Sequence, residues 1–266
     1  MKNELKMLHT TLCRKDVGKY VFLPGSPQRV DRIAQYLENS FFIAENREHR
    51  TYGGYLEGQL TLVTSTGMGG PSTCIALEEL VKLGAKTFIR IGTCSSTNTR
   101  IKRGDVIIPT AAVRMDGTSL HYAPIEYPAV PNFELHKYLL KSATSHQYPY
   151  HADVIITRDS FYTQNEAHLK PIGYELINKW NSYKAMGAIA TEMECAPLFI
   201  AAASLNVGAA GVLICATDYN KYSEEENIYP ISFEPRAIEV AIEAMRIKIR
   251  NDVNIERKQF KDGSKK

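Results

Sequence analysis

Short apolar segments alternate with amphipathic segments through most of the chain, and this alternation is the feature that most constrains the fold. The apolar segment YVFLP (20–24) precedes a helical pattern at 26–39, and QLTLVTSTG (59–67) precedes another at 71–84. Strands that are buried on both faces appear as continuous apolar runs, and strands that alternate with helices indicate a parallel sheet covered by helices. We therefore predict an α/β fold: a single three-layer domain with a mixed, mainly parallel central sheet flanked by helices.

The domain is predicted to span residues 1–250, a length that one large α/β domain can reach without splitting. Apolar residues at helical spacing in 234–250 predict a last helix that closes the domain, and the polar segment 251–266 is predicted to be a frayed tail. Residues 55–65, with a Glu-Gly turn, predict a hairpin. Residues 118–131 contain three prolines and predict a long ordered loop, which in a compact domain tends to be functional.

Composition excludes several classes of protein. The apolar fraction of 44% and the charged fraction of 23% are typical of a globular chain, and the net charge is only +3. Basic residues are scattered apart from the C-terminal RKQFKDGSKK, so we expect no nucleic-acid partner. Five widely spaced cysteines without a CxxC motif indicate reduced thiols. The chain contains no apolar run typical of a signal peptide or a membrane span, and we expect a cytoplasmic protein.

Two predicted strand ends carry groups suited to an anion. Gly25 and Ser26 precede a helix that starts at Pro27, and Arg29 lies one turn into that helix. The free N–H groups of a helix start bind anions, although an ordinary capped helix has the same pattern. Arg90 lies within the apolar strand pattern FIRIGT, where a cation requires an anion. That anion is either an internal glutamate or an oxyanion ligand held by the guanidinium, by the Thr93 hydroxyl and by nearby backbone.

A third strand end, AIATEMEC (188–195), places two carboxylates in an apolar stretch. In a strand, Glu192 and Glu194 would point to one side and Met193 to the other. A carboxylate that accepts two hydroxyl groups is a natural clamp for a ribose, whereas the alternative for either glutamate is a bridge to an arginine. Phe161, which follows another strand, provides either a stacking surface for a base or ordinary core packing. Asp218 ends a further strand at the same rim.

Seven segments of the chain occur in an order that resembles the hexameric nucleoside phosphorylases. These segments are LPGSPQRV (23–30), NREHR (46–50), STGMGGPSTCIALEEL (65–80), FIRIGT (88–93), RMDGTSLHYAPIEYPAV (114–130), DSFY (159–162) and EMEC (192–195). The resemblance covers residues 9–218, and the segment 114–130 is most similar to the uridine phosphorylase branch. It implies phosphorolysis of a nucleoside to a free base and ribose 1-phosphate, with phosphate as co-substrate and no organic cofactor.

The resemblance also implies roles for individual residues. The implied phosphate-binding residues are Gly25, Arg29, Arg90 and Thr93, together with Arg47 from a neighbouring subunit. The implied ribose-binding residues are Met193 and Glu194, with Glu192 nearby and His9 from the adjacent chain. Phe161 would pack against the base, and Arg90 and Glu194 would be catalytic. A monovalent cation, K⁺, is implied at Glu48, Met68 and Ser72 between paired subunits of a homo-oligomer, a hexamer built from dimers.

Two departures from the family pattern leave the base open. Uridine phosphorylases read the base with a glutamine and an arginine after the Phe-Tyr pair; here Gln164 or Asn165 could replace the glutamine, but Ala167 stands at the arginine position. Lys170 could substitute for it as a point charge. Asp218 resembles the general acid of the purine branch, which protonates a departing purine. We favour uridine, with a purine nucleoside or methylthioadenosine as the alternative.

Two rival functions remain at this stage. A nucleosidase would use water in place of phosphate, but the retained arginines argue against it. The other rival is a non-catalytic protein that binds nucleosides or nucleic acids. A nucleic-acid-binding protein would show a clustered basic face with interleaved aromatic residues, which the sequence does not contain.

Overall fold

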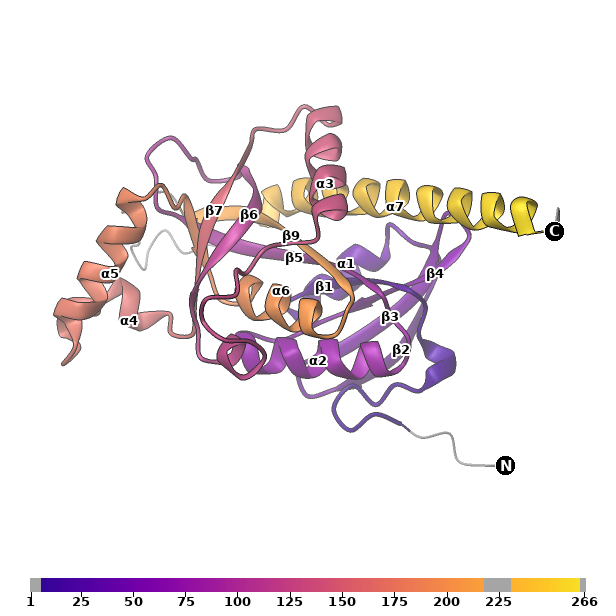
Figure 1. Ribbon diagram of the computed structural model, residues 1–266, viewed down its shortest axis with the longest axis horizontal. Coiled ribbons are helices and arrows are strands. Elements are labelled where there is room, and N and C mark those ends of the chain that lie inside the picture. Colours follow the sequence, from indigo (N-terminus) through magenta and orange to yellow (C-terminus); the bar gives the residue numbers. More distant parts are fainter. Residues whose placement is uncertain (1–5, 218–230, 264–266) are drawn as a thin grey trace.

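The computed structural model describes residues 6–217 and 231–263 and contains one central sheet (Figure 1). The strands are β1 (Tyr20–Pro24), β2 (Glu38–Asn46), β3 (His49–Leu56), β4 (Gln59–Thr64), β5 (Thr87–Ser96), β6 (Val106–Met115), β7 (Tyr150–Arg158), β8 (Ala190–Glu192) and β9 (Gly208–Thr217). The α-helices are α1 (Pro27–Ala34), α2 (Gly70–Lys82), α3 (Phe133–Ser145), α4 (Tyr162–Asn165), α5 (Gly173–Ala185), α6 (Cys195–Ser204) and α7 (Glu234–Gly263). Short 3₁₀ turns are η1 (Arg14–Asp16), η2 (Thr118–His121), η3 (Ala167–Leu169) and η5 (Ile231–Phe233).

The sheet is mixed, as predicted, with strand order β2-β3-β4-β1-β5-β8-β7-β6-β9. Strand β1 pairs in parallel with β4 and β5, and β7 pairs in parallel with β6 and β8. Strand β5 also pairs in parallel with β9, which closes β5, β8, β7, β6 and β9 into a ring of pairings. The β2–β3, β3–β4, β5–β8 and β6–β9 pairs are antiparallel. Sequence periodicity predicts the buried strands but not β2, whose first two residues we assigned to a helical pattern at 26–39. It also does not predict this closure, because pairing partners are far apart in the chain.

Helices cover both faces of the sheet and form two hydrophobic clusters. One cluster joins α2 and α6 to the sheet through buried residues such as Leu77 and Phe199, and the other joins α1, α3 and α7 through Val30, Leu139 and Val240. Strand β5 contributes alternate residues to the two clusters, as its period of two requires. Figure 1 shows α2 and α6 on one side of the sheet and α3 and α7 on the other. The three-layer prediction is therefore confirmed.

The predicted hairpin and the predicted loop are both present. The β3–β4 hairpin turns at Glu57 and Gly58, which both have positive φ values, 49° and 72°. Two positive φ values at the central residues are the signature of a tight hairpin turn that follows the sheet twist. The loop at 118–131 is irregular after η2, and it is fixed by Arg114, whose guanidinium donates to the backbone oxygens of Ser119, Ala123, Pro124 and Tyr127.

The last helix is longer than predicted. We expected it to end at residue 250 before a frayed tail, but α7 is helical to Gly263. The first turn beyond residue 250 is held against the body, because Asp252 accepts a hydrogen bond from the Tyr20 hydroxyl at 3.0 Å and pairs with Lys248 at 2.7 Å. The Lys19 ammonium lies 2.8 Å from Glu256 one turn later. These contacts explain the added helix, since isolated polar helices are marginal in water.

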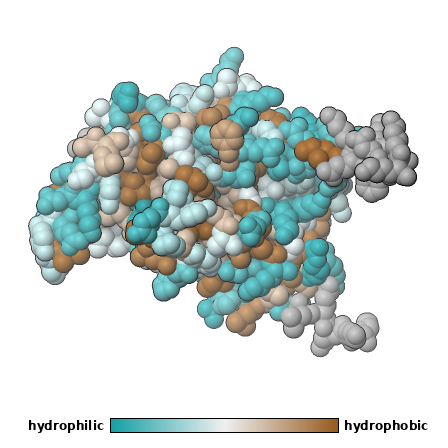
Figure 2. Space-filling view, viewed as in Figure 1, coloured by the Kyte–Doolittle hydropathy of each residue, from teal (hydrophilic) through white to brown (hydrophobic). Residues whose placement is uncertain are grey.

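Other expectations from composition agree with the structure. All five cysteines are buried and free. Hydrophilic and hydrophobic residues are interspersed over the face drawn in Figure 2, as the balanced charge suggests. In the part of the chain that the structure describes, no helix is long and apolar enough to cross a membrane.

Candidate active site

A cavity of about 600 Å³ lies at the carboxyl ends of β1, β5, β7 and β9, where α/β sheets bind ligands. We call it the main cavity. Most residues predicted for the site line it: Gly25, Arg29, Glu48, Met68, Arg90, Thr93, Phe161, Glu192, Met193 and Glu194. Segments from opposite halves of the sequence thus converge, as expected from the strand ends.

Arg90 lies between the two glutamates of the TEMEC segment. Its Nε is 3.3 Å from Glu192 Oε2, and its Nη2 donates to Glu194 Oε2. Burial lowers the pKa of Arg90, but the charges of Glu194 and Glu192 outweigh burial and leave that pKa raised. The Nη1 atom is buried and has no hydrogen-bond partner among the described residues. The internal bridge that the sequence left open therefore exists, and one donor of the fork remains for a ligand.

Glu192 is held entirely by protein groups. Its carboxylate accepts the Thr157 hydroxyl and the backbone N–H groups of Glu194 and Cys195, at 2.8 and 3.0 Å for the latter two. These bonds satisfy the N–H groups at the start of α6. Strand β8 ends at Glu192 and the chain then turns into α6, so the alternation expected of a strand does not extend to Glu194. Both carboxylates nevertheless reach Arg90.

Glu194 is the more available of the two carboxylates. Its Oε1 accepts the backbone N–H of Gly69 at 2.7 Å, and Gly69 has a φ of 85°, a conformation that favours glycine. Burial raises the pKa of Glu194 and the charge of Arg90 lowers it, with the net direction upward. An ionised carboxylate has about four lone-pair sites, more than these protein contacts use, so it can still accept a hydroxyl group. Met193, the neighbouring residue, is partly exposed and lines the main cavity.

The predicted anion site at α1 has an internal counter-ion that sequence analysis missed. Arg29 pairs through Nε with Glu234 of α7, and its Nη1 donates to the Ile91 carbonyl at 3.0 Å. Arg32 Nε lies 2.8 Å from the same glutamate. Burial lowers the pKa of Arg29, and Glu234 opposes that effect. Two arginines thus share one carboxylate. Nothing in the spacing of residues 29 and 234 could have indicated this pair.

The N-terminus of α1 itself differs in one detail from the prediction. Ser26 is at the N-cap and Pro27 is in the first turn, but the Ser26 side chain makes no capping hydrogen bond to the helix. Its hydroxyl contacts Gln28 instead. Gly25 lies beside the β4–α2 loop, because its carbonyl accepts the N–H of Gly67 at 3.0 Å. The two glycine loops therefore form one side of the main cavity.

The base side of the main cavity contains an arginine that was not assigned a role from sequence. Phe161 and Arg158 both line the main cavity, whereas Lys170 pairs with Glu166 at 3.3 Å and does not line it. Lys170 therefore lies outside the lining of the main cavity, and its substitution for the family arginine stays a prediction. Arg158 ends the apolar run VIITR, and the reasoning applied to Arg90 would have found it.

Three residues predicted for the base side have side chains that the structure does not describe. Gln164 and Asn165 belong to α4, but their side chains are outside the described part, and Asp218 is outside the described residues. Their roles stay predictions.

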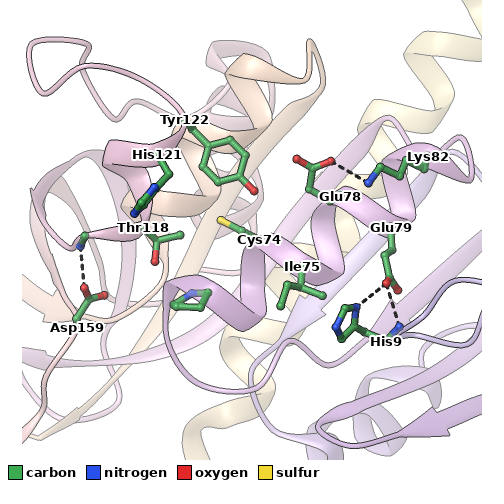
Figure 3. A pocket seen from close by; sticks show the side chains of 12 residues that line it. His9, Cys74, Ile75, Glu78, Glu79, Lys82, Thr118, His121, Tyr122 and Asp159 are labelled. Carbon is green, nitrogen blue, oxygen red and sulfur yellow. Dashed lines mark hydrogen bonds and ion pairs between the residues drawn. The ribbon is translucent and has the colours of Figure 1, made fainter.

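His9 and Arg47 do not line the main cavity of their own chain. Figure 3 shows His9 in a second cavity, of about 670 Å³, beside α2 and η2. Glu79 accepts the backbone N–H of His9 at 2.9 Å and lies 2.8 Å from its Nδ1, and it also accepts two bonds from Thr10. Arg47 is exposed at the β2–β3 turn. Their roles toward a neighbouring chain stay predictions.

The predicted cation ligands cluster around Gly67. A Cβ atom at Gly67 would lie 2.7 Å from Glu48 Cγ and 3.1 Å from Ser72 Oγ, and the Ser72 hydroxyl donates to the Met68 carbonyl at 3.1 Å. Carboxylate, hydroxyl and carbonyl oxygens are ligands for hard cations. Among the described residues no group of three or more His, Cys, Asp or Glu side chains could hold a metal. The K⁺ assignment stays a prediction.

The fold and the cavity define an α/β protein that can hold a small anion and a polyhydroxyl ligand side by side at one sheet edge. Residues 19–247 match the Phosphorylase superfamily, and the chain belongs to that family. It is 38% identical over 255 residues to a uridine phosphorylase from Treponema pallidum, covering 93% of this chain and 99% of that protein. Identity to the Escherichia coli uridine phosphorylase is 36%, covering 90% and 97%. A guanosine phosphorylase from Halorubrum lacusprofundi is 34% identical, covering 81% and 84%.

Proposed function

We propose that this protein is a nucleoside phosphorylase that cleaves the N-glycosidic bond of uridine with inorganic phosphate, giving uracil and ribose 1-phosphate. The observation that carries the proposal is the contact of Arg90 with Glu194 in the wall of the main cavity, because it joins an anion-binding group to a sugar-binding group. Nearly full-length similarity to proteins named uridine phosphorylase supports the same reaction.

The anion side would hold phosphate. The free Nη1 of Arg90, the Thr93 hydroxyl and the Gly25 backbone offer donors, and Arg29 lines the same cavity while it is paired with Glu234. Arg47 of a neighbouring subunit completes the set. Phosphate held beneath C1′ stabilises the positive charge that develops there as the glycosidic bond stretches, and one phosphate oxygen then attacks.

The sugar and base would occupy the rest of the main cavity. Glu194 accepts the 2′- and 3′-hydroxyl groups, Met193 packs against the ring, and His9 of the adjacent chain binds the 5′-hydroxyl. Glu192 orients the segment. Phe161 packs on the base, and Gln164 or Asn165 reads its edge. No organic cofactor takes part.

The oligomer and the cation follow from the same reasoning. Sites that borrow His9 and Arg47 require at least a dimer, and a hexamer of three dimers satisfies both contacts. A K⁺ ion at Glu48, Met68 and Ser72 would lie between paired subunits. We place the enzyme in the cytoplasm, in nucleoside catabolism and pyrimidine salvage.

A second candidate is a purine nucleoside phosphorylase with Asp218 as general acid. The 34% identity to a guanosine phosphorylase supports this second candidate. A purine gains more than uracil from protonation as it leaves, and a carboxyl group at this rim could supply the proton.

The decisive experiment is a substrate panel of uridine, thymidine, inosine, guanosine, adenosine and methylthioadenosine, each with and without phosphate, followed by base absorbance. We expect phosphate-dependent release of uracil as the fastest reaction. Release without phosphate would establish a nucleosidase, faster release of a purine would establish the second candidate, and binding without release would remove catalysis.

Variants test the site within the same assay. Glu194→Ala should lower kcat/KM for uridine by about 100-fold or more, because transition-state contacts to the sugar are lost. Glu134→Ala is the matched control, since Glu134 also binds a cation, Lys248, but outside the main cavity. Near-normal activity of Glu194→Ala would refute the ribose assignment.

A further inference from the structure

Arg158 is a buried cation whose hydrogen-bond partners, among the residues that the structure describes, are all neutral. It is 6% exposed at the end of β7, its Nε donates to the Thr191 hydroxyl at 3.0 Å, and its Nη1 donates to the carbonyl oxygens of Ser160 and Phe161 at 2.8 and 2.9 Å. Within the described part of the chain it forms no ion pair with a carboxylate, and no residue there accepts a bond from its Nη2. This differs from Arg29 and Arg90, which both have glutamate partners.

The charge of Arg158 is placed beside the aromatic wall of the main cavity. Its Cζ lies 5.3 Å from the centroid of the Phe161 ring, and both residues line the main cavity. Burial lowers the pKa of Arg158 to about 10, with the charge of Glu192 opposing, so the guanidinium is still charged at neutral pH. A buried charge whose hydrogen-bond partners in the described part of the chain are neutral gains from a further acceptor that a ligand supplies. A ligand that binds in the main cavity beside Phe161 would lie close to this cation.

Resting on the proposed function, we propose that Arg158 is a specificity-determining residue that donates a charge-assisted hydrogen bond to an exocyclic carbonyl oxygen of the nucleobase. Uracil and guanine carry such an oxygen, whereas adenine does not. A site built around a buried donor rejects a ligand that leaves the donor unpaired. Arg158 would thereby do what the base-reading arginine does in uridine phosphorylases, since neither residue 167 nor residue 170 lines the main cavity.

The contact also acts on the chemistry. When phosphate oxygen bonds to C1′, the C1′–N bond breaks and its electron pair leaves with the base, which becomes an anion before it takes a proton from water. Part of that negative charge resides on the carbonyl oxygen. A fixed cation beside this oxygen is complementary to the charge that develops in the transition state.

Binding of free bases tests the inference without depending on turnover. Calorimetry on the full-length protein with saturating phosphate would give Kd values for uracil, guanine and adenine, and a titration without phosphate would give the Kd for ribose 1-phosphate. We expect the wild type to bind uracil or guanine and not adenine. Arg158→Met should raise the Kd for that base by about 10- to 100-fold, the range of a hydrogen bond to a charged group. The Kd for ribose 1-phosphate should change by less than threefold.

Two further variants guard against a merely structural effect. Arg158→Lys keeps the charge without the fork and should lie between wild type and Arg158→Met; it carries the test alone if the methionine variant does not fold. Arg236→Met is the matched control, because Arg236 also packs on aromatic rings, Phe233 at 5.0 Å and Tyr148 at 5.7 Å, outside the main cavity.

Three results would overturn the base contact: adenine binding as tight as uracil or guanine binding, no binding of any base by the wild type, or equal weakening of base and ribose 1-phosphate in the Arg158 variants. A kinetic arm separates this outcome from failure of the proposed function. Wild-type cleavage of uridine that requires phosphate but is unchanged in Arg158→Met would refute only the base contact, whereas no phosphate-dependent cleavage of any nucleoside by the wild type would refute the proposed function.

Discussion

Replacing Arg90 by leucine should destabilise the protein as well as inactivate it. Arg90 is 3% exposed and is the cation between Glu192 and Glu194, which are 4% and 5% exposed. Arg90→Leu would leave two carboxylates close together in the interior without a counter-charge. Breaking a buried ion pair by removing one partner costs about 3–5 kcal/mol. We expect a loss of that size in the free energy of unfolding at pH 8.

The loss should depend on pH in a direction that the structure fixes. Burial already raises the pKa of Glu194 with Arg90 present, and without the arginine the repulsion from Glu192 would raise it further. A carboxyl group whose folded-state pKa is raised binds a proton more readily when folded. It therefore contributes stability that is fully present below its unfolded pKa and is lost as pH rises through the folded pKa. For one proton the slope is about −1.4 kcal/mol per pH unit between these two pKa values.

Urea unfolding at a fixed protein concentration, at several pH values between 5 and 8, measures this effect. A constant concentration matters because any association of subunits adds to the apparent stability in a concentration-dependent way. The double variant Arg90→Leu/Glu194→Gln should recover part of the loss at pH 8, since it removes one of the repelling charges. The reasoning would be refuted if the free energy of unfolding of Arg90→Leu at pH 8 lay within about 0.5 kcal/mol of the wild-type value, a difference typical of a neutral surface change. It would also be refuted if the stability of the variant rose with pH.

Three further predictions concern neighbouring groups. Because burial raises the pKa of Glu194, the acid-side decrease in kcat/KM for uridine should begin at a higher pH than it would with an exposed glutamate. Glu194→Gln should abolish this acid-side decrease; a decrease that is unchanged in the variant would show that another group causes it. Gly67→Ala should destabilise by about 1–2 kcal/mol in thermal unfolding, since Gly67 has a φ of 74° and the added methyl group would meet Glu48; unchanged stability would show that the loop adjusts. Glu79→Gln should raise KM for uridine about tenfold with little change in kcat, because His9 loses an anionic partner; equal loss in kcat would contradict a binding role.

The sequence predicts the layers of this fold better than its connections. Continuous apolar runs locate β1, β5 and β9, because such strands are buried on both faces whatever their partners. The closing pair β5–β9 joins residues more than a hundred positions apart, and no local pattern encodes it. The end of α7 was misplaced for a related reason: the polar stretch after residue 250 is held by Tyr20 and Lys19, which lie at the other end of the chain.

For the site as well, sequence predicts some features and not others. Charged residues in apolar strands, such as Arg90 and Glu194, are conspicuous in sequence because a buried charge must have a function or a partner. Their partners are not conspicuous: Glu234 binds Arg29 from a segment of ordinary helical pattern, and Glu192 serves the start of α6 as much as Arg90. Sequence therefore located the charges correctly but could not decide between an internal bridge and a ligand, and for Arg90 the structure contains the bridge together with a free donor.

The charge balance of the main cavity bears on the role that the proposed function gives to a neighbouring subunit. Its lining in the described residues includes three arginines and three glutamates, namely Arg29, Arg90, Arg158, Glu48, Glu192 and Glu194. Such a lining has no excess positive charge, so a bound phosphate would be left with its charge unmatched in a partly buried site. The proposed function assigns the matching cation to Arg47 of a neighbouring subunit, which is exposed and does not line the main cavity of its own chain. Phosphate affinity should consequently fall when subunits dissociate and when Arg47 is replaced by methionine, by similar factors; a dissociated subunit that binds phosphate as tightly as the assembly would contradict the argument.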